Sequence, residues 1–158
     1  MTVARYRVRG RIEIDATPGE VYAIAADPAM VPLYAPEVER IEVIERIGER
    51  ESRVRSRLRI GPFRRADVYR YRYVRGRSYA GIQERGRLFR GYFAFSFVPC
   101  GGRTVVTHVE GIASAVPGLA RFLGFVYFRV LARGGIGEEL RRLKGLVEER
   151  SRGRGGKG

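Results

Sequence analysis

The sequence lacks most of the residues on which common kinds of protein site depend. Among its 158 residues, Cys100 is the only cysteine and His108 the only histidine. A single cysteine excludes an intramolecular disulfide and a cysteine-based metal cluster. We find no glycine-rich phosphate loop after a strand, no cluster of metal ligands and no serine nucleophile motif, so we expect no metal and no cofactor.

Long hydrophobic runs are also missing. No apolar stretch approaches the ~20 residues of a membrane-spanning helix. The first residues, MTVARYRVRGR, lack the apolar segment and small-residue cleavage site of a signal peptide, so we expect a cytoplasmic protein. The length fits one domain over residues 1–150. The last residues, 151–158 (SRGRGGKG), offer nothing apolar to bury and predict a disordered basic tail.

The charge is strongly positive and almost entirely due to arginine. The net charge is +14 and the pI about 10.9, and with lysine only at Lys144 and Lys157 the 31 basic residues include 31 − 2 = 29 arginines. Such a balance can indicate a nucleic-acid partner. However, the arginines are dispersed, asparagine is absent and Gln83 is the only glutamine, as is typical of chains from hot environments. We favour this second interpretation and expect no specific nucleic acid.

The segment from Ile12 to Pro36 leads from a strand into a signalled helix and then towards a second one. Thr17 can cap the first helix, Pro18 suits its first turn, and Glu20 completes a capping box. Asp27-Pro28 repeats the signal of a cap followed by proline. Two short helices followed by strands and a terminal helix are an order of elements that indicates a cavity.

Most of the remaining chain is predicted to form strands separated by short turns. Alternation of apolar and polar residues predicts about seven strands, the last six forming an antiparallel meander. The predicted ranges are Ala4–Ile14, Val38–Ile47, Arg53–Ile60, Asp67–Val74, Ser78–Glu84, Leu88–Val98 and Thr104–Ser114.

After Pro117 the apolar period becomes helical, in two stripes. The first runs from Leu119 to Val130 and the second from Ile136 to Val147, and they differ in phase by roughly one residue's rotation. Because one straight helix could not turn both stripes to a sheet, we expect a break, kink or bulge at Gly134-Gly135.

Two neighbouring strands each carry several aromatic residues on one face. A wall built from them would suit a mostly apolar pocket with a few polar groups, although a packed core is the alternative. The alternating arginines of the tyrosine strand fall on its other face, which argues against a surface for stacking nucleic-acid bases. The candidate ligand-binding residues are Tyr69, Tyr71, Tyr73, Phe93, Phe95 and Phe97 on the strands, and Phe122, Val126 and Val130 on the helical segment.

Few residues are candidates for catalysis. His108 and Glu110 share a strand face and could do acid–base work. The opposite face, with Val105 and Val109, is more apolar, so we expect the pair to face solvent. Asp67 is in phase with the tyrosines and could lie at a cavity rim, or pair with one of the many arginines.

The segments ATPGEVYAIAADP, PLYAPEVERIEVIE, GGRTVVTHVEG and ELRRLKGLVEE resemble the START-like superfamily of polyketide cyclases and dehydrases, also called SRPBCC or Bet v 1-like. RSRLRIGPFRRADV and VPGLARFLGFVYFRVLA are also similar to the branch formed by the G-type accessory subunits of carbon monoxide dehydrogenase. The resemblance implies a helix-grip fold of the α+β class: a bent antiparallel sheet around a long C-terminal helix, with a pocket between them. The superfamily has no universal catalytic residues, so none is implied.

The combined expectation is a helix-grip domain that binds a small hydrophobic, lipid-like or aromatic molecule, for example a quinone or a polyketide, without catalysis. The first alternative is a cyclase, dehydratase or hydrolase that uses Asp67, His108, Glu110 or the tyrosines in the same cavity. A basic nucleic-acid-binding module is the least favoured alternative. The superfamily also implies a peripheral membrane or protein-complex contact as a further partner.

Overall fold

The computed structural model of the protein describes residues 3–131 and 135–156, and the side chains of all of these except residues 130 and 131. Its strands match the predicted ranges to within a few residues. In chain order the elements are β1 (Ala4–Ile14), α1 (Pro18–Ala25), α2 (Val31–Tyr34), β2 (Val38–Ile47), β3 (Glu51–Ile60), β4 (Phe63–Val74), β5 (Ser78–Gln83), β6 (Arg90–Cys100), β7 (Arg103–Ser114), α3 (Leu119–Phe125), the π-helix η1 (Val126–Leu131) and α4 (Gly135–Gly155).

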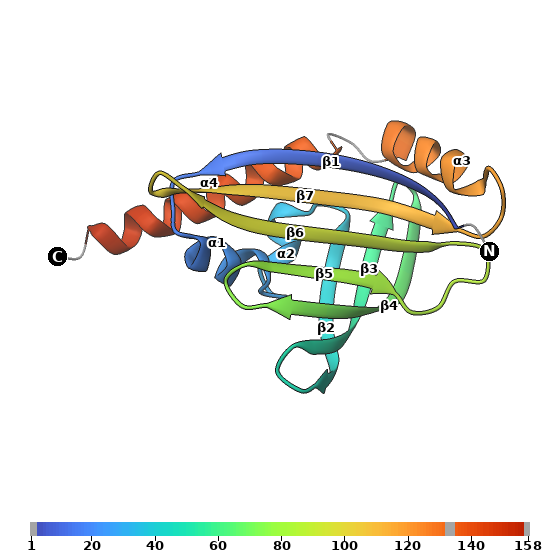
Figure 1. Ribbon diagram of the computed structural model, residues 1–158, viewed down its shortest axis with the longest axis horizontal. Helices are drawn as coiled ribbons and strands as arrows, with labels where there is room; N and C mark the ends of the chain where they lie inside the picture. Colours follow the sequence, from blue (N-terminus) through green and yellow to red (C-terminus); the bar gives the residue numbers. More distant parts are fainter. Residues whose placement is uncertain (1–2, 132–134, 157–158) are drawn as a thin grey trace.

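The strands form one antiparallel sheet in the order β1-β7-β6-β5-β4-β3-β2. Strands β2 to β6 each pair with the next strand in sequence, which confirms the meander, and β1 closes onto β7 with Ala4 opposite Ser114. In Figure 1, β1, β7 and β6 run across the view while β2 and β3 stand nearly upright, so the sheet is strongly bent. This bent sheet and the C-terminal helix confirm the α+β helix-grip prediction.

The start of α1 follows the sequence signal closely. Thr17 caps the helix by accepting from the Glu20 amide at 3.3 Å, and the Glu20 carboxylate accepts from the Thr17 amide at 2.8 Å. The second signal was misplaced, because α2 begins at Val31 with Met30 as its cap. Asp27 instead accepts from the amide of Ala29 and closes a turn, the other common use of an aspartate before a short bend.

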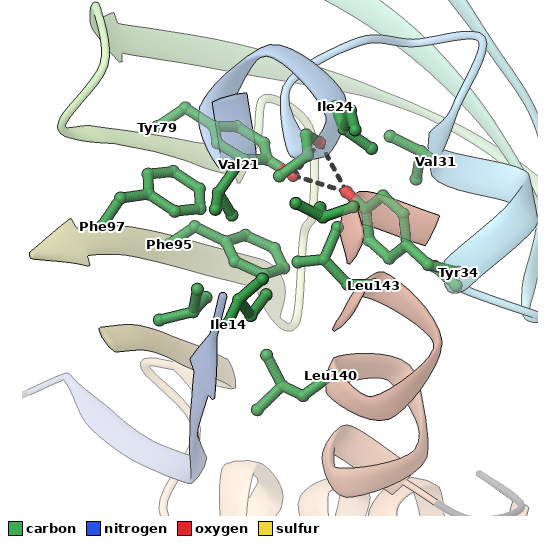
Figure 2. Close-up of a cluster of buried hydrophobic side chains, with 14 of the residues drawn as sticks. Ile14, Val21, Ile24, Val31, Tyr34, Tyr79, Phe95, Phe97, Leu140 and Leu143 are labelled. Carbon is green, nitrogen blue, oxygen red and sulfur yellow. Dashed lines mark hydrogen bonds between the residues drawn. The ribbon is translucent and has the colours of Figure 1, made fainter. Parts of the chain in front are cut away.

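The hydrophobic core lies where α4 crosses the sheet beside α1. Leu140, Leu143 and Val147 of the predicted second stripe are each at most 2% exposed. Figure 2 shows Leu140 and Leu143 facing Ile14 of β1 and the Phe95 ring of β6. The second stripe is therefore core, as its helical spacing predicts.

The predicted interruption before the second stripe is present. α4 begins at Gly135, whose φ of +55° lies in the left-handed region. A regular right-handed helix therefore cannot run through this residue. The segment before it is already irregular, because α3 passes into the π-helix η1 at Val126. Gly134 lies outside the described residues.

The C-terminal end differs from the sequence expectation. Residues 151–155 continue α4 instead of forming a disordered tail. Once Leu140 to Val147 are packed, each further residue adds one backbone hydrogen bond to an existing helix, which is far easier than starting one. Among the described helices, none has the length and apolar character that crossing a membrane requires.

Candidate ligand-binding pocket

A pocket with a volume of about 380 Å³ lies between the inner face of the sheet and the helical segments. Strands β2 to β7 form most of its wall, α2 and the α3–η1 segment close other sides, and α4 contributes one described residue, Glu139. Apolar and aromatic side chains predominate in the lining. They include Tyr34, Leu58, Tyr69, Tyr71, Tyr79, Phe89, Phe93, Phe95, Val126 and Tyr127.

The aromatic strand faces point inward, as the alternation predicts. On β4 the arginines Arg70 and Arg72 are exposed, whereas Tyr71 is buried between them. Of the nine predicted ligand-binding residues, five line the pocket, namely Tyr69, Tyr71, Phe93, Phe95 and Val126. The structure thus places two aromatic residues of β4 and two of β6 around the same pocket.

Two of the predicted residues share these faces but belong to the packed end of the molecule. The Tyr73 hydroxyl lies 2.8 Å from Ser52 Oγ, and the Phe97 ring meets Tyr22 of α1 edge-on at 6.0 Å between centroids. Neither lines the pocket, because α1 fills the space beside them. Strand periodicity specifies a face, but it does not indicate where along that face a cavity opens.

The placement of Phe122 was wrong. It is 64% exposed and does not line the pocket. α3 instead buries Ala120 and Gly124, and Gly124 comes so close to the Tyr6 ring that a Cβ would collide with it. Small residues one turn apart let this helix lie against β1, and that turns Phe122 outward. Val130 belongs to η1, and its side chain lies outside the described residues.

The expectation that His108 and Glu110 face solvent was also wrong. His108 is 1% exposed, its ring stacks on Phe95 at 3.7 Å, and both residues line the pocket. The more apolar face of β7, with Val105 and Val109, is the outer one. The prediction took the more apolar face of the strand as the buried one, which holds where a strand packs on a dry core. Here the inner face borders a pocket and carries polar groups into it.

A third acidic residue joins this pair. Glu139 of α4 is 7% exposed, and its Oε1 lies 3.5 Å from His108 Nδ1, while Glu110 Oε1 lies 3.6 Å from His108 Nε2. Neither ring nitrogen has a hydrogen-bond partner among the described residues. Sequence reasoning missed Glu139, although its position three residues after Ile136 and four before Leu143 placed a carboxyl within the buried stripe.

Burial changes the protonation of this cluster. Desolvation lowers the pKa of His108 to about 3, so the imidazole is neutral near pH 7. Burial, and then the nearby charge of Glu37, raise the pKa of Glu110 to about 7. Burial, Glu110 and Glu37 likewise raise the pKa of Glu139. The site therefore holds one carboxyl, Glu110, whose pKa lies near neutrality, and a second, Glu139, whose pKa is raised, beside a neutral histidine.

The same three residues are the ones that could hold a metal, since their donor atoms lie within 4.8 Å of one another. However, Glu110 and Glu139 approach different nitrogens of the ring. Each carboxylate thus makes its shortest contact with a different ring nitrogen, and a shared ion would need one nitrogen to serve both.

The rim is polar and internally paired. Asp67, for which the sequence left open a cavity rim or an arginine partner, lines the pocket and has an arginine partner. It pairs with Arg65 and accepts from Gln83 Nε2 at 3.0 Å. The guanidinium of Arg65 lies over the Phe89 ring at 5.3 Å. These contacts join β4 to β5 and to Phe89, the residue before β6.

Comparisons with known proteins agree with the fold. A family model described as polyketide cyclase / dehydrase and lipid transport matches residues 5–148. No curated protein matches the chain by sequence. The superfamily resemblance inferred from the sequence is thereby confirmed. The match does not test the narrower similarity to the accessory subunits of carbon monoxide dehydrogenase, which stays a prediction.

Several solved structures share the fold across nearly the whole chain. A protein of Thermus thermophilus is 23% identical, with a TM-score of 0.73, over 92% of this chain and 99% of that one. The Zhui aromatase/cyclase of a Streptomyces species is 15% identical, with a TM-score of 0.77, over 94% and 96%. A START superfamily protein of Mycobacterium smegmatis is 18% identical, with a TM-score of 0.65, over 91% and 95%.

Proposed function

Because the chain belongs to the polyketide cyclase / dehydrase and lipid transport family, we propose that it binds a small hydrophobic, lipid-like or aromatic molecule in the pocket between sheet and helices. The observation that carries the proposal is the pocket itself. Its volume of about 380 Å³ falls in the range of small-molecule sites, and its walls are mainly aliphatic and aromatic with few polar groups.

A pocket-filling variant tests this proposal. Leu58 of β3 lines the pocket, whereas Arg59, the next residue, is exposed on the other face of the same strand. Leu58→Trp should fill part of the cavity, and Arg59→Trp is the matched control that places the same ring outside. Organic extracts of the purified proteins, and their binding of an aromatic probe, are then compared by mass spectrometry and fluorescence.

We expect Leu58→Trp to lose the co-purifying molecule and to bind the probe at least about tenfold more weakly, because the added ring occupies the same volume. Arg59→Trp should behave like the unmodified protein. Equal binding by both variants, with both folded, would contradict a ligand site in this pocket.

A second candidate function is acid–base catalysis on the bound molecule. The observation that favours it is His108, buried between two carboxyls with both ring nitrogens unpaired among the described residues. A carboxylate could remove the α proton of a β-hydroxyketone while a protonated carboxyl gives its proton to the departing hydroxyl, which leaves an enone and water. With a pKa raised to about 7, Glu110 can serve as either the acid or the base near neutrality.

This candidate is tested with an aromatic β-hydroxyketone, whose conversion to the conjugated enone is followed by absorbance. Turnover that is lost in Glu110→Gln, while the variant still binds the enone, would establish catalysis. Binding of the β-hydroxyketone without enone formation, in the unmodified protein at several pH values, would leave ligand binding as the function.

A further inference from the structure

The charge of the pocket is opposite to that of the protein. The whole chain has 31 basic and 17 acidic residues. Among the described residues that line the pocket, four are acidic, namely Glu37, Asp67, Glu110 and Glu139, and only Arg65 is basic. Since Arg65 is paired with Asp67, the described lining offers no other arginine or lysine to Glu37, Glu110 and Glu139.

The contacts of these carboxyls leave room for an external partner. Glu110 and Glu139 form no ion pair with a described residue. Their closest nitrogen neighbours are those of His108, at 3.6 and 3.5 Å, and this imidazole is neutral. Arg142 pairs with Glu138, and its charge opposes the rise that burial causes in the pKa of Glu37, without an ion pair between the two. A buried carboxylate without a partner is costly, and so is a buried imidazole with no hydrogen bond. The pocket therefore has an electrostatic deficit that a positive group would relieve.

We propose that the ligand is a hydrophobic amine whose protonated ammonium group binds the Glu37, Glu110 and Glu139 cluster while its apolar body lies against the aromatic wall. This inference rests on the proposed function and names its ligand class. An ammonium group carries three N–H donors and no acceptor, which matches a set of carboxylate oxygens. Tyr71 and Phe93 also line the pocket, and the faces of aromatic rings attract cations.

The same geometry disfavours other head groups. A carboxylate ligand would add a negative charge beside three carboxyls. An alcohol of the same shape could form hydrogen bonds but would leave the charge deficit in place. We therefore expect a selectivity of ammonium over alcohol over carboxylate.

Binding should also be linked to protons. An ammonium group favours ionised carboxylates, so its arrival should displace a proton from Glu110 or Glu139. The other titratable groups beside the cluster do not compete, because burial keeps the pKa of His108 low. Burial also raises the pKa values of the neighbouring tyrosines, namely Tyr34, Tyr69, Tyr71, Tyr79 and Tyr127. Affinity for the amine should thus increase as pH rises through about 7.

The test uses three naphthalene probes of matched shape: naphthylmethylammonium, naphthylmethanol and naphthoate. Calorimetry of the intact protein gives their affinities at pH values below and above 7, in two buffers with different ionisation enthalpies. We expect the ammonium probe to bind at least about tenfold more tightly than the alcohol, as charge-assisted hydrogen bonds exceed neutral ones, and naphthoate most weakly. Binding of the ammonium probe should release protons.

Two variants and a control locate the effect. Glu110→Gln and Glu139→Gln should lower the affinity for the ammonium probe towards that of the alcohol. Glu138→Gln makes the same change on the adjacent residue of α4, which pairs with Arg141 and Arg142 outside the pocket, and should have no effect. If a variant fails to fold, the proton release of the unmodified protein still tests the idea.

The outcomes separate this inference from the function beneath it. Equal affinity for ammonium and alcohol, or binding of the ammonium probe without proton release, would overturn the amine proposal while ligand binding stands. If none of the three probes binds and nothing co-purifies with the unmodified protein, the proposed function fails as well.

Discussion

The last carbonyl of α1 offers a quantitative test of how the pocket wall is held. The Ala25 oxygen accepts from Tyr34 Oη at 2.6 Å and from Tyr79 Oη at 2.8 Å, and the two hydroxyl oxygens lie 2.9 Å apart (Figure 2). Two hydroxyl hydrogens thus serve three short contacts. All three groups are buried, and helix ends leave carbonyls such as this one without an intrahelical partner.

Removing one hydroxyl should cost little, since the other still donates to Ala25. We expect Tyr34→Phe and Tyr79→Phe each to lower the free energy of unfolding by about 1 kcal/mol, the net value of one hydrogen bond. The double variant leaves the buried carbonyl with no donor, which costs about 1–3 kcal/mol more. Its loss should therefore exceed the sum of the single losses by about 1–3 kcal/mol.

Urea unfolding followed by circular dichroism measures all three variants at constant m-value. Tyr22→Phe is the control, because the Tyr22 hydroxyl makes no hydrogen bond to another described residue and its loss should change stability by less than about 0.5 kcal/mol. A double variant that loses no more than the sum of the singles would refute the reasoning, since it would show that the carbonyl finds another donor.

Three further predictions concern the core, the helix start and pH. Leu143→Ala should lower the free energy of unfolding by about 2–5 kcal/mol, because Leu143 is fully buried, and Phe122→Ala by less than about 0.5 kcal/mol, because Phe122 is exposed. Gly135→Ala should destabilise the protein by about 1–2 kcal/mol, because the φ of Gly135 is +55°. Gly145→Ala should instead stabilise it by about 0.5–1 kcal/mol, because Gly145 lies within α4 and a Cβ there meets no other atom. Denaturant titration measures both of these pairs of variants. Glu110 binds its proton more tightly in the folded state, with a pKa of about 7 against 4.5, so its contribution to stability is complete below about pH 4.5 and is lost as pH rises through 7. Glu110→Gln should remove up to about 3 kcal/mol of this pH dependence, and unfolding curves with an unchanged pH slope would contradict the assignment.

Local signals in the sequence were sufficient wherever the physics is local. The alternation from Ala4 to Ile14 predicted β1 to the residue, because a strand with one inward face must repeat every second position. The apolar content of Val38 to Ile47 also predicted β2 to the residue. The capping box of Thr17 and Glu20 involves contacts within four residues and was equally reliable. Asp27 was ambiguous, since the same side chain closes a turn or caps a helix.

The candidate site was predicted only in part. The sequence assigned four aromatic residues to one inner surface because they are in phase on their strands, namely Tyr69, Tyr71, Phe93 and Phe95. In the structure β5 lies between these two strands and pairs with both. It also assigned Phe122 to this surface, and that error came from weighting large apolar residues over small ones. The small residues decide how closely α3 approaches the sheet, and the approach decides which side of the helix faces inward.

The sequence by itself determined the order of elements, the faces of the strands, the buried stripe of α4 and the strongly basic charge, since each depends on near neighbours or on composition. Only the tertiary structure decided that the polar face of β7 turns inward and that Glu139, 29 residues beyond Glu110 in the chain, meets the same histidine. Which end of each aromatic face stays open also depends on where α1 and α4 pack. These are contacts between distant segments, and their desolvation gives a basic protein an acidic pocket.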